Sequence, residues 1–321
     1  MNRRSFLNQS TSCSAHILAL GCVGSSLAGR VFAAADERRV VAREKWGRLE
    51  QVAPGAWALI STPFDTSDFK TVCNGGIVAG ETGVLAIEAM MQPAGAAWLA
   101  DQAKALTGRR PSDVVITHFH GDHSTGHSGY TSGGNSPRIW LTGETRKAAE
   151  RDFAKKDPQV PAFARVEMVG AGGPTTIDLG GREVKVIPRR GHTSSDVTIE
   201  LSDPKIVWTG DLFFNRMFPN YGDAKPDLLN QFGEHLGKLD KDVVIVPGHG
   251  PIADRPAVQN YRDFLAVVQA GATKAHRAGD GVEVAAEAFK LPESMSEWMI
   301  WSPDNIKKAF AAWYRVLGKQ D

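Results

Sequence analysis

The sequence predicts an α/β fold, because short apolar runs of β type alternate with segments whose apolar residues recur at helical spacing. Four of these runs end directly in a Gly-containing turn that holds His or Asp. With 321 residues, 42% of them hydrophobic, the chain can bury a sizeable core. We therefore expect sheets and helices in layers, with polar side chains gathered at the mouth of a sheet.

The first part of the chain predicts three strands and two helices. The strands are residues 56–60, 77–79 and 84–87, the last two joined by a turn at 81–83. A helix is expected over 96–106, where Gly108 marks its end, and another over 143–156.

Further β-type runs occur at 114–116, 184–188, 206–208 and 243–246, and helical spacing dominates the rest. Helices are expected at about 224–239, with His235 on its surface, and at 256–277, where His276 suits the C-terminal dipole. A last helix covers 304–317, with Asp304 as its N-cap.

Residues 36–255 are thus expected to form a catalytic domain, and residues 256–321 a helical extension packed on it. The aromatic segment 296–301 is expected to pack this extension against the domain. The alternative is that it forms a substrate lid or a dimer contact.

Residues 117–123 read Thr-His-Phe-His-Gly-Asp-His and follow the apolar run 114–116. They place three imidazoles and a carboxylate close together, and the Gly lets the backbone turn so that these groups converge. Imidazole and carboxylate suit zinc, iron or manganese, and a catalytic zinc keeps one position open for water. The alternative is a chance polar loop, since motif matches carry false positives.

Three further turns argue against chance. His192 follows the run 184–188, Asp211 follows 206–208, and His249 follows 243–246 within a Pro-Gly-His-Gly-Pro turn. Five of the nine histidines therefore lie at strand ends. The sequence indicates a metal-dependent enzyme.

In this order, the His-x-His-x-Asp-His run, the Gly-His, the Thr-Gly-Asp and the Pro-Gly-His-Gly-Pro resemble the metallo-β-lactamase superfamily over residues 50–255. The resemblance implies a four-layer αββα sandwich with two metal ions at one edge of its two sheets. It assigns His118, His120 and His192 to the first metal, Asp122, His123 and His249 to the second, and Asp211 as the bridge. A bridging Asp is typical of the glyoxalase II, lactonase and nuclease branches, whereas true zinc β-lactamases carry Cys or Ser there.

The implied cofactor is two Zn²⁺ per chain, with iron as the other metal that accepts this ligand set. Two metals about 3.5–4 Å apart share a water, lower its pKa toward neutrality and give a hydroxide that attacks the substrate. Asp122 and Asp211 are the expected catalytic carboxylates, Asp122 also moving a proton. Many relatives carry Asp where this chain has Glu88, so a supporting role for Glu88 is a weaker inference.

Three loops are expected to shape the pocket for a small-molecule substrate. Residues 61–74 are expected to form either a mobile flap or an ordinary hairpin loop. Residues 124–136 contain His127, for which a structural hydrogen bond is a simpler interpretation than a bond to the substrate. The third loop follows Asp211 directly. It offers Asn215 for an oxyanion and Arg216 for an anionic group, although Arg216 could also pair with a local carboxylate.

The N-terminus matches a twin-arginine export signal over residues 1–35, which predicts a partnership with that export machinery and a periplasmic mature protein. Arg3 and Arg4 precede a short apolar stretch that is too short to span a membrane, and Ala33 to Ala35 form the cleavage site. The minor alternative is a lipoprotein anchored through Cys22.

Removing residues 1–35 leaves 34 Lys and Arg against 36 Asp and Glu, a net charge of −2. Such a chain has no electrostatic footprint for nucleic acid, which argues against the nuclease branch. Cys73 is then the only cysteine, so an intramolecular disulfide is excluded, and it is expected to be a small buried residue. The sequence leaves the oligomeric state open.

The leading hypothesis is a dinuclear zinc hydrolase that cleaves a small ester, thioester, lactone or lactam in the periplasm. The basic glutathione-binding cluster of the glyoxalase II branch is not found, and Asp211 weakens the case for lactams. The alternatives are a mononuclear iron oxidoreductase similar to persulfide dioxygenases and a non-catalytic periplasmic metal-binding accessory protein.

Overall fold

The computed structural model describes residues 38–318 except 63, 64, 66, 157 and 171. The described residues form one compact unit. The predictions of an export signal and of a lipid anchor at Cys22 fall on residues outside the described part. Among the described residues, no helix is both long and apolar enough to cross a membrane.

Two sheets form the centre of this unit. The first has eight strands in sequence order, of which β4, β5 and β6 lie centrally. Its strands are β1 (Val40–Glu44), β2 (Gly47–Ala53), β3 (Ala56–Ser61), β4 (Gly75–Ala79), β5 (Val84–Ile87), β6 (Asp113–Val115), β7 (Arg138–Leu141) and β8 (Val166–Met168). The second sheet has the order β13-β12-β11-β10-β9. Its strands are β9 (Thr175–Asp178), β10 (Glu183–Pro188), β11 (Val197–Ser202), β12 (Lys205–Trp208) and β13 (Val244–Val246).

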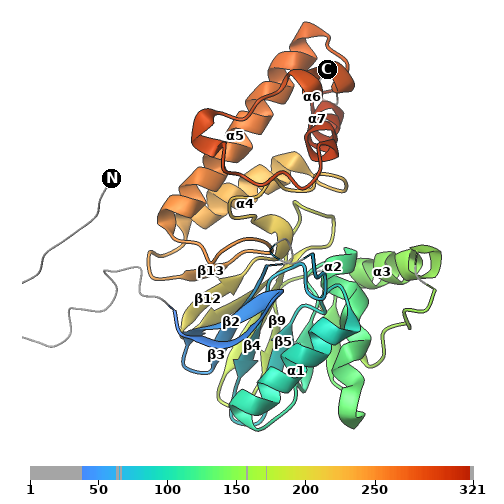
Figure 1. Ribbon diagram of the computed structural model, residues 1–321, viewed down its shortest axis with the longest axis vertical. Coiled ribbons are helices and arrows are strands. Elements are labelled where there is room, and N and C mark those ends of the chain that lie inside the picture. Colours follow the sequence, from blue (N-terminus) through green and yellow to red (C-terminus); the bar gives the residue numbers. More distant parts are fainter. Residues whose placement is uncertain (1–37, 63–64, 66, 157, 171, 319–321) are drawn as a thin grey trace, which may run out of the picture. The chain divides into compact units, whose positions relative to one another are not determined.

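Helices lie outside both sheets (Figure 1). The α-helices are α1 (Pro93–Thr107), α2 (Gly121–Ser124), α3 (Gly143–Lys156), α4 (Pro226–Lys238), α5 (Arg255–Ala278), α6 (Val282–Ala288) and α7 (Asp304–Leu317). Helix α1 packs beside β4 and β5 on one side, whereas α4 and α5 pack together on the other.

Alternating side chains of the central strands divide the core into layers. In β5, Val84 belongs to the hydrophobic cluster shared with α1, whereas Leu85 belongs to the cluster between the two sheets. In β12, Trp208 faces the cluster between the sheets, and Val207 belongs to the cluster that holds α4, α5 and α7. Because central strands of both sheets bury both faces, the order of layers is helix, sheet, sheet, helix. This confirms the α/β class and the αββα sandwich with helices in the C-terminal region.

Helices α5, α6 and α7 share one hydrophobic cluster with α4 and the second sheet. Phe264 of α5 and Phe310 of α7 are almost fully buried there. At the start of α7 the prediction was off by one position, since Pro303 occupies the N-cap and Asp304 is the first helical residue. The Asp304 carboxylate still lies in the first turn, where the helix dipole favours it.

The segment after the His-rich run is more regular than an open loop. Residues 125–134 form 3-10 turns packed against α1. A Cβ at Gly129 would lie 2.0 Å from the Pro93 carbonyl oxygen, so only glycine allows this close approach. The segment is therefore part of the framework that supports the site.

Candidate metal centre

The predicted ligands converge because the strands that precede them end at the same edge. β5 and β6 are parallel, and so are β12 and β13. The carboxyl ends of parallel neighbours lie side by side, which brings the turn at Asp211 next to the turn at His249. β10 ends close by and supplies His192. The seven predicted ligands form two groups. Within each group, the candidate ligand atoms all lie within 4.8 Å of one another.

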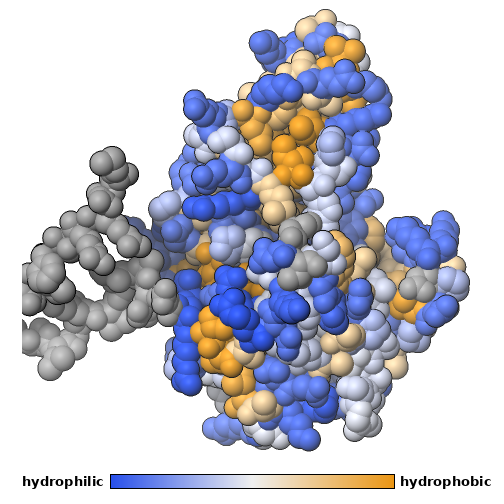
Figure 2. Space-filling view, in the orientation of Figure 1, coloured by the Kyte–Doolittle hydropathy of each residue, from blue (hydrophilic) through white to orange (hydrophobic). Residues whose placement is uncertain are grey.

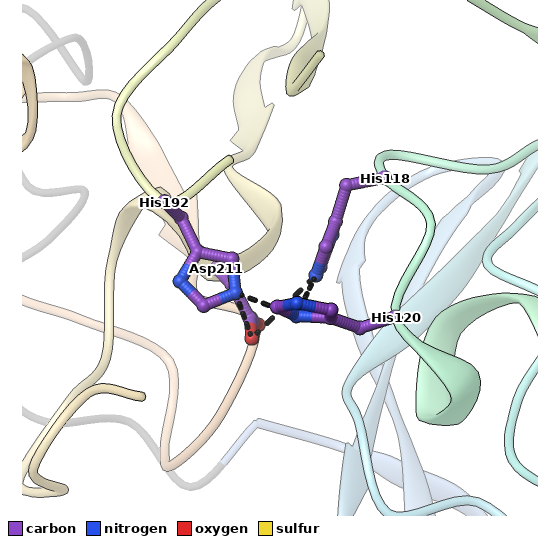
Figure 3. Close-up of side chains that lie close together, drawn as sticks. All are labelled: His118, His120, His192 and Asp211. Carbon is purple, nitrogen blue, oxygen red and sulfur yellow. Dashed lines mark hydrogen bonds and ion pairs between the residues drawn. The ribbon is translucent and has the colours of Figure 1, made fainter. Parts of the chain in front are cut away.

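The first group consists of His118, His120, His192 and Asp211 (Figure 3). His120 Nδ1 lies 3.1 Å from His118 Nε2 and 2.9 Å from His192 Nε2. Asp211 Oδ2 lies 3.2 Å from His192 Nε2 and 3.8 Å from His118 Nε2. Three imidazole nitrogens and one carboxylate oxygen thus face a common point.

The second group consists of Asp122, His123 and His249. His249 Nε2 lies 3.3 Å from Asp122 Oδ2, and His123 Nε2 lies 3.5 Å from the same oxygen. Asp211 Oδ1 lies 3.1 Å from His123 Nε2 and 3.2 Å from His249 Nε2. One oxygen of Asp211 therefore faces each group, as a bridging carboxylate requires.

The residues present fit a pair of cations. His123 Nε2 and Asp211 Oδ1 are buried, and among the described residues neither has a hydrogen-bond partner of acceptable geometry. A buried lone pair without a donor is costly unless a cation meets it. Imidazole and carboxylate donors of this number suit zinc or iron.

Electrostatics support the same conclusion. Burial and the neighbouring imidazoles hold the pKa of His118 well below its ordinary value, and burial lowers the pKa of His192 to about 3. Both shifts favour the neutral imidazole, which is the form that binds a metal. Although burial opposes ionisation, the imidazoles of His249 and His123 hold the pKa of Asp211 well below its ordinary range. Against burial, the charges of Asp211 and Asp122 raise the pKa of His249 to about 9, so these carboxylates strongly favour a positive charge here.

Glu88 orients two of the ligands from beneath the site. Thr117 Oγ1 donates to Glu88 Oε1 at 2.6 Å, so the same hydroxyl can accept from His118 Nδ1 at 3.0 Å. His123 Nδ1 lies 3.0 Å from Glu88 Oε1. These contacts place the ring protons on Nδ1 and leave both Nε2 lone pairs for a metal. The supporting role inferred for Glu88 agrees with this geometry.

Two supporting carboxylates were missed from the sequence. Asp223 Oδ2 lies 3.0 Å from His120 Nε2, which leaves Nδ1 of that ring as the ligand atom. Asp196 accepts from the His192 backbone N–H at 3.0 Å and from the Thr193 hydroxyl at 2.6 Å. The one available signal for Asp196 was its position four residues after His192, in a turn. Asp223 lies 103 residues from its partner and offered no local signal.

Close backbone contacts hold the bridging residue. A Cβ at Gly248 would lie 2.1 Å from Asp211 Oδ1, so the turn that carries His249 must have glycine at this position. Asn74 fastens the same turn, since its amide donates to the carbonyls of Pro247 at 2.9 Å and Gly250 at 2.7 Å.

Asn215 lies beside the site, but its side chain is used within the protein. Its amide nitrogen donates to the Pro251 carbonyl at 2.9 Å, and the residue is 5% exposed. This hydrogen bond joins the loop that follows Asp211 to the turn that carries His249. Arg216 is exposed and has a positive φ of 59°, and no ion pair of its side chain is found among the described residues.

Two other predictions concern residues near the site. His127 Nδ1 lies 3.1 Å from the Ser124 carbonyl oxygen and the ring packs against Phe153 and Phe163, which is a structural role. Cys73 is a free, buried cysteine beneath the second group, and burial raises the pKa of its thiol to about 12. It lies outside both ligand groups.

Known proteins resemble this chain in sequence over part of its length. A hydroxyacylglutathione hydrolase of Chelativorans sp. is 28% identical over 185 residues, which cover 55% of this chain and 62% of that enzyme. A type 2 metallo-beta-lactamase of Bacillus sp. is 24% identical over 162 residues, covering 49% and 58%. An uncharacterized protein of Mycobacterium bovis is 34% identical over 97 residues, so the chain spans 43% of that relative.

Solved structures show the same fold. The metallo-beta-lactamase of Erythrobacter litoralis matches with a TM-score of 0.56 at 18% identity, over 70% of this chain and 98% of that one. The inverting sec-alkylsulfatase Pisa1 of Pseudomonas sp. matches with a TM-score of 0.64 at 17% identity, over 84% and 50%.

A family model matches residues 72–249, which include all seven residues of the two groups and more than half of the chain. The chain therefore belongs to the metallo-beta-lactamase superfamily.

Proposed function

We propose that this protein is a dinuclear zinc hydrolase that cleaves a small ester, thioester, lactone or lactam. The observation that carries the proposal is the position of Asp211, whose two carboxylate oxygens each face a separate group of donors. The second group also disfavours a mononuclear iron enzyme. An enzyme with one metal ion would not need a second set of converging ligands, yet the three side chains of this group converge. The relatives named as a metallo-beta-lactamase and as a hydroxyacylglutathione hydrolase support the reaction class.

When bound, two zinc ions would lower the pKa of water toward neutrality and polarise the bond that is cleaved. The protein holds the donors in place through Glu88, Asp223 and Asp196, so little reorganisation is needed during the reaction. Asp122 is the candidate for moving a proton. Its side chain is 22% exposed, and the imidazoles of His123 and His249 keep its pKa well below the ordinary value against the effect of burial.

The metal assignment is tested by elemental analysis of the mature chain, residues 36–321, purified from its native compartment. We expect about two zinc ions per chain. One iron per chain would instead support the oxygen-dependent oxidoreductase. Absence of bound metal after reconstitution with zinc would contradict the assignment of the ligands.

The reaction is tested with His192→Ala and Asp211→Ala. Both variants should lose metal and at least about 100-fold in kcat/KM on whichever ester, thioester, lactone or lactam the wild type cleaves. Arg277→Ala, on the exposed end of α5, serves as the control and should behave like the wild type. Full activity with normal metal content in either ligand variant would refute the site.

We also propose that the enzyme works in the periplasm after twin-arginine export of the folded, metal-loaded precursor. Arg3 and Arg4 within the N-terminal sequence support this. Replacing both with Lys should leave precursor in the cytoplasm, as cell fractionation and immunoblotting would show. Unchanged export of the double variant would exclude this route.

A further inference from the structure

A segment of the C-terminal region reaches the metal centre. Trp298 anchors it, since its ring stacks on Phe264 of α5 with centroids 4.5 Å apart and an interplanar angle of 11°. The Met299 backbone then pairs with the loop that follows Asp211. Met299 N donates to the Arg216 carbonyl at 3.0 Å, and Phe218 N donates to the Met299 carbonyl at 2.8 Å. The segment is therefore fixed on both sides.

Three consecutive side chains of this fixed segment are large, apolar and exposed. Met299 is 40% exposed, Ile300 38% and Trp301 43%. Scattered exposed hydrophobic residues are ordinary, but an adjacent group beside a polar site calls for an explanation. Hydrophobic surface is also visible over the region of α5 and α7 in Figure 2.

The group continues into the metal centre through Trp301. Its ring centroid lies 6.1 Å from that of His249 at an interplanar angle of 90°, and Phe214 stacks on the same imidazole at 5.0 Å. Among the seven ligands, His120 and Asp122 are the most exposed, at 17% and 22%. His249 Nε2 is 3.3 Å from Asp122 Oδ2, so Trp301 lies near the edge through which solvent reaches the site.

We propose that Met299, Ile300 and Trp301 form a wall that binds the apolar group of the substrate beside the cleaved bond. The inference rests on the proposed hydrolase function and narrows it to esters or thioesters that carry an alkyl or aryl group of several carbons. A preformed apolar wall next to a few polar groups is the usual composition of a small-molecule site. Continuity with a metal ligand favours a substrate over a second copy of the chain.

The test uses carboxylates, because a carboxylate is the acid product of ester or thioester hydrolysis. Acetate, butanoate, hexanoate and octanoate are titrated into the zinc-loaded protein by calorimetry. A fully buried methylene would tighten binding about 4-fold, so a wall that covers one side of the chain should give about 2-fold per methylene. Octanoate should then bind about 16-fold tighter than butanoate.

In Trp301→Ala this ratio should fall to about 4-fold or less, with zinc content and melting temperature unchanged. Ile300→Ser, at a neighbouring exposed position, is a second variant in case the first folds poorly, and it should also reduce the ratio. The matched control is Val284→Ala, because Val284 is 60% exposed on α6 and is not part of the wall. It should retain the wild-type ratio.

A wild-type ratio near one, or an unchanged ratio in both wall variants, would overturn the proposal. Sedimentation of the same samples tests whether a second copy of the chain covers this surface instead. A wild-type dimer that dissociates in Trp301→Ala would assign the surface to a dimer contact and overturn the proposal of a substrate site. The two proposals fail separately. Binding that depends on chain length, without hydrolysis of any substrate, would support the wall and contradict the hydrolase function. Hydrolysis without such a dependence would support the hydrolase function and contradict the wall.

Discussion

At the scale of single residues, Glu88 is tightly constrained beneath the metal centre. It is 1% exposed, and its φ of 71° lies in the left-handed region that side chains other than glycine rarely adopt. Strain of this kind persists where the surroundings fix it, and here the carboxylate accepts from Thr117 and His123. Its contribution to function should therefore appear in metal affinity.

Glu88→Gln should weaken zinc binding by about 10–100-fold, because Gln has one acceptor oxygen for contacts that use both carboxylate oxygens, Oε1 toward the Thr117 hydroxyl and His123 and Oε2 toward the Thr117 N–H. Competition with a chromophoric chelator measures the affinity. Glu88→Asp keeps the charge and should recover part of the loss. Wild-type affinity in the Gln variant would show that these contacts do not orient the ligands.

Arg216 offers a second test at this scale. Its side chain is exposed on the loop after Asp211, and none of the described ion pairs involves it. If it binds an anionic group of the substrate, Arg216→Ala should raise KM for an acidic ester about 10-fold and leave kcat nearly unchanged, since removal of uniform binding acts on KM. A neutral ester of the same length is the control. An equal rise in KM for both esters would mean that Arg216 shapes the loop instead.

At the scale of elements, the turn after β13 places His249 only because Gly248 has no side chain. Gly248→Ala would push a methyl group into Asp211 Oδ1 and the Gly210 backbone, where the distances would be 2.1 and 2.7 Å. We expect about 1–3 kcal/mol lower stability, loss of one zinc ion and a large fall in activity. Denaturant unfolding and elemental analysis measure these effects.

The control for that variant is Gly143→Ala at the start of α3, where an added Cβ has no atom within 4 Å. It should be neutral or slightly stabilising. If Gly248→Ala behaved in the same way, the turn would have to be able to move away from the bridging carboxylate.

The sequence predicted several elements whose pattern is strong, but it missed the inner strand β11, in which Thr198 and Glu200 interrupt the apolar run. The central strands β3, β5 and β12 were found within about one residue, since burial on both faces produces continuous apolar runs. Strands β1 and β9 were missed because they are mostly exposed at sheet edges and read as polar segments. Helix α6 is short and mostly exposed, so it carries little helical periodicity.

At the scale of the whole molecule, the ligand groups could be predicted and their support could not. Residues 118–123 are adjacent in the chain, and His192, Asp211 and His249 each follow an apolar strand, so local pattern was sufficient. The partnership of His120 with Asp223 depends on how α4 is brought to the first sheet, which no local pattern encodes. The hydrogen bond from Asn215 to Pro251 is likewise a tertiary contact that no local pattern encodes.

The last prediction concerns the stability of the whole unit. The metal centre joins turns from both sheets, and it buries the Asp211 carboxylate among imidazoles where a cation would balance its charge. At free zinc of about 100 times its dissociation constant, binding should stabilise the fold by about 2.7 kcal/mol, or roughly 5–10 °C in melting temperature. Scanning calorimetry with zinc and with excess chelator measures the difference, and readdition of zinc should restore it. Asp211→Ala is the control, since its melting temperature should respond much less to the chelator. Identical curves for the wild type under both conditions would mean that zinc binding does not stabilise the fold. The two sheets would then be held together by their apolar cores alone.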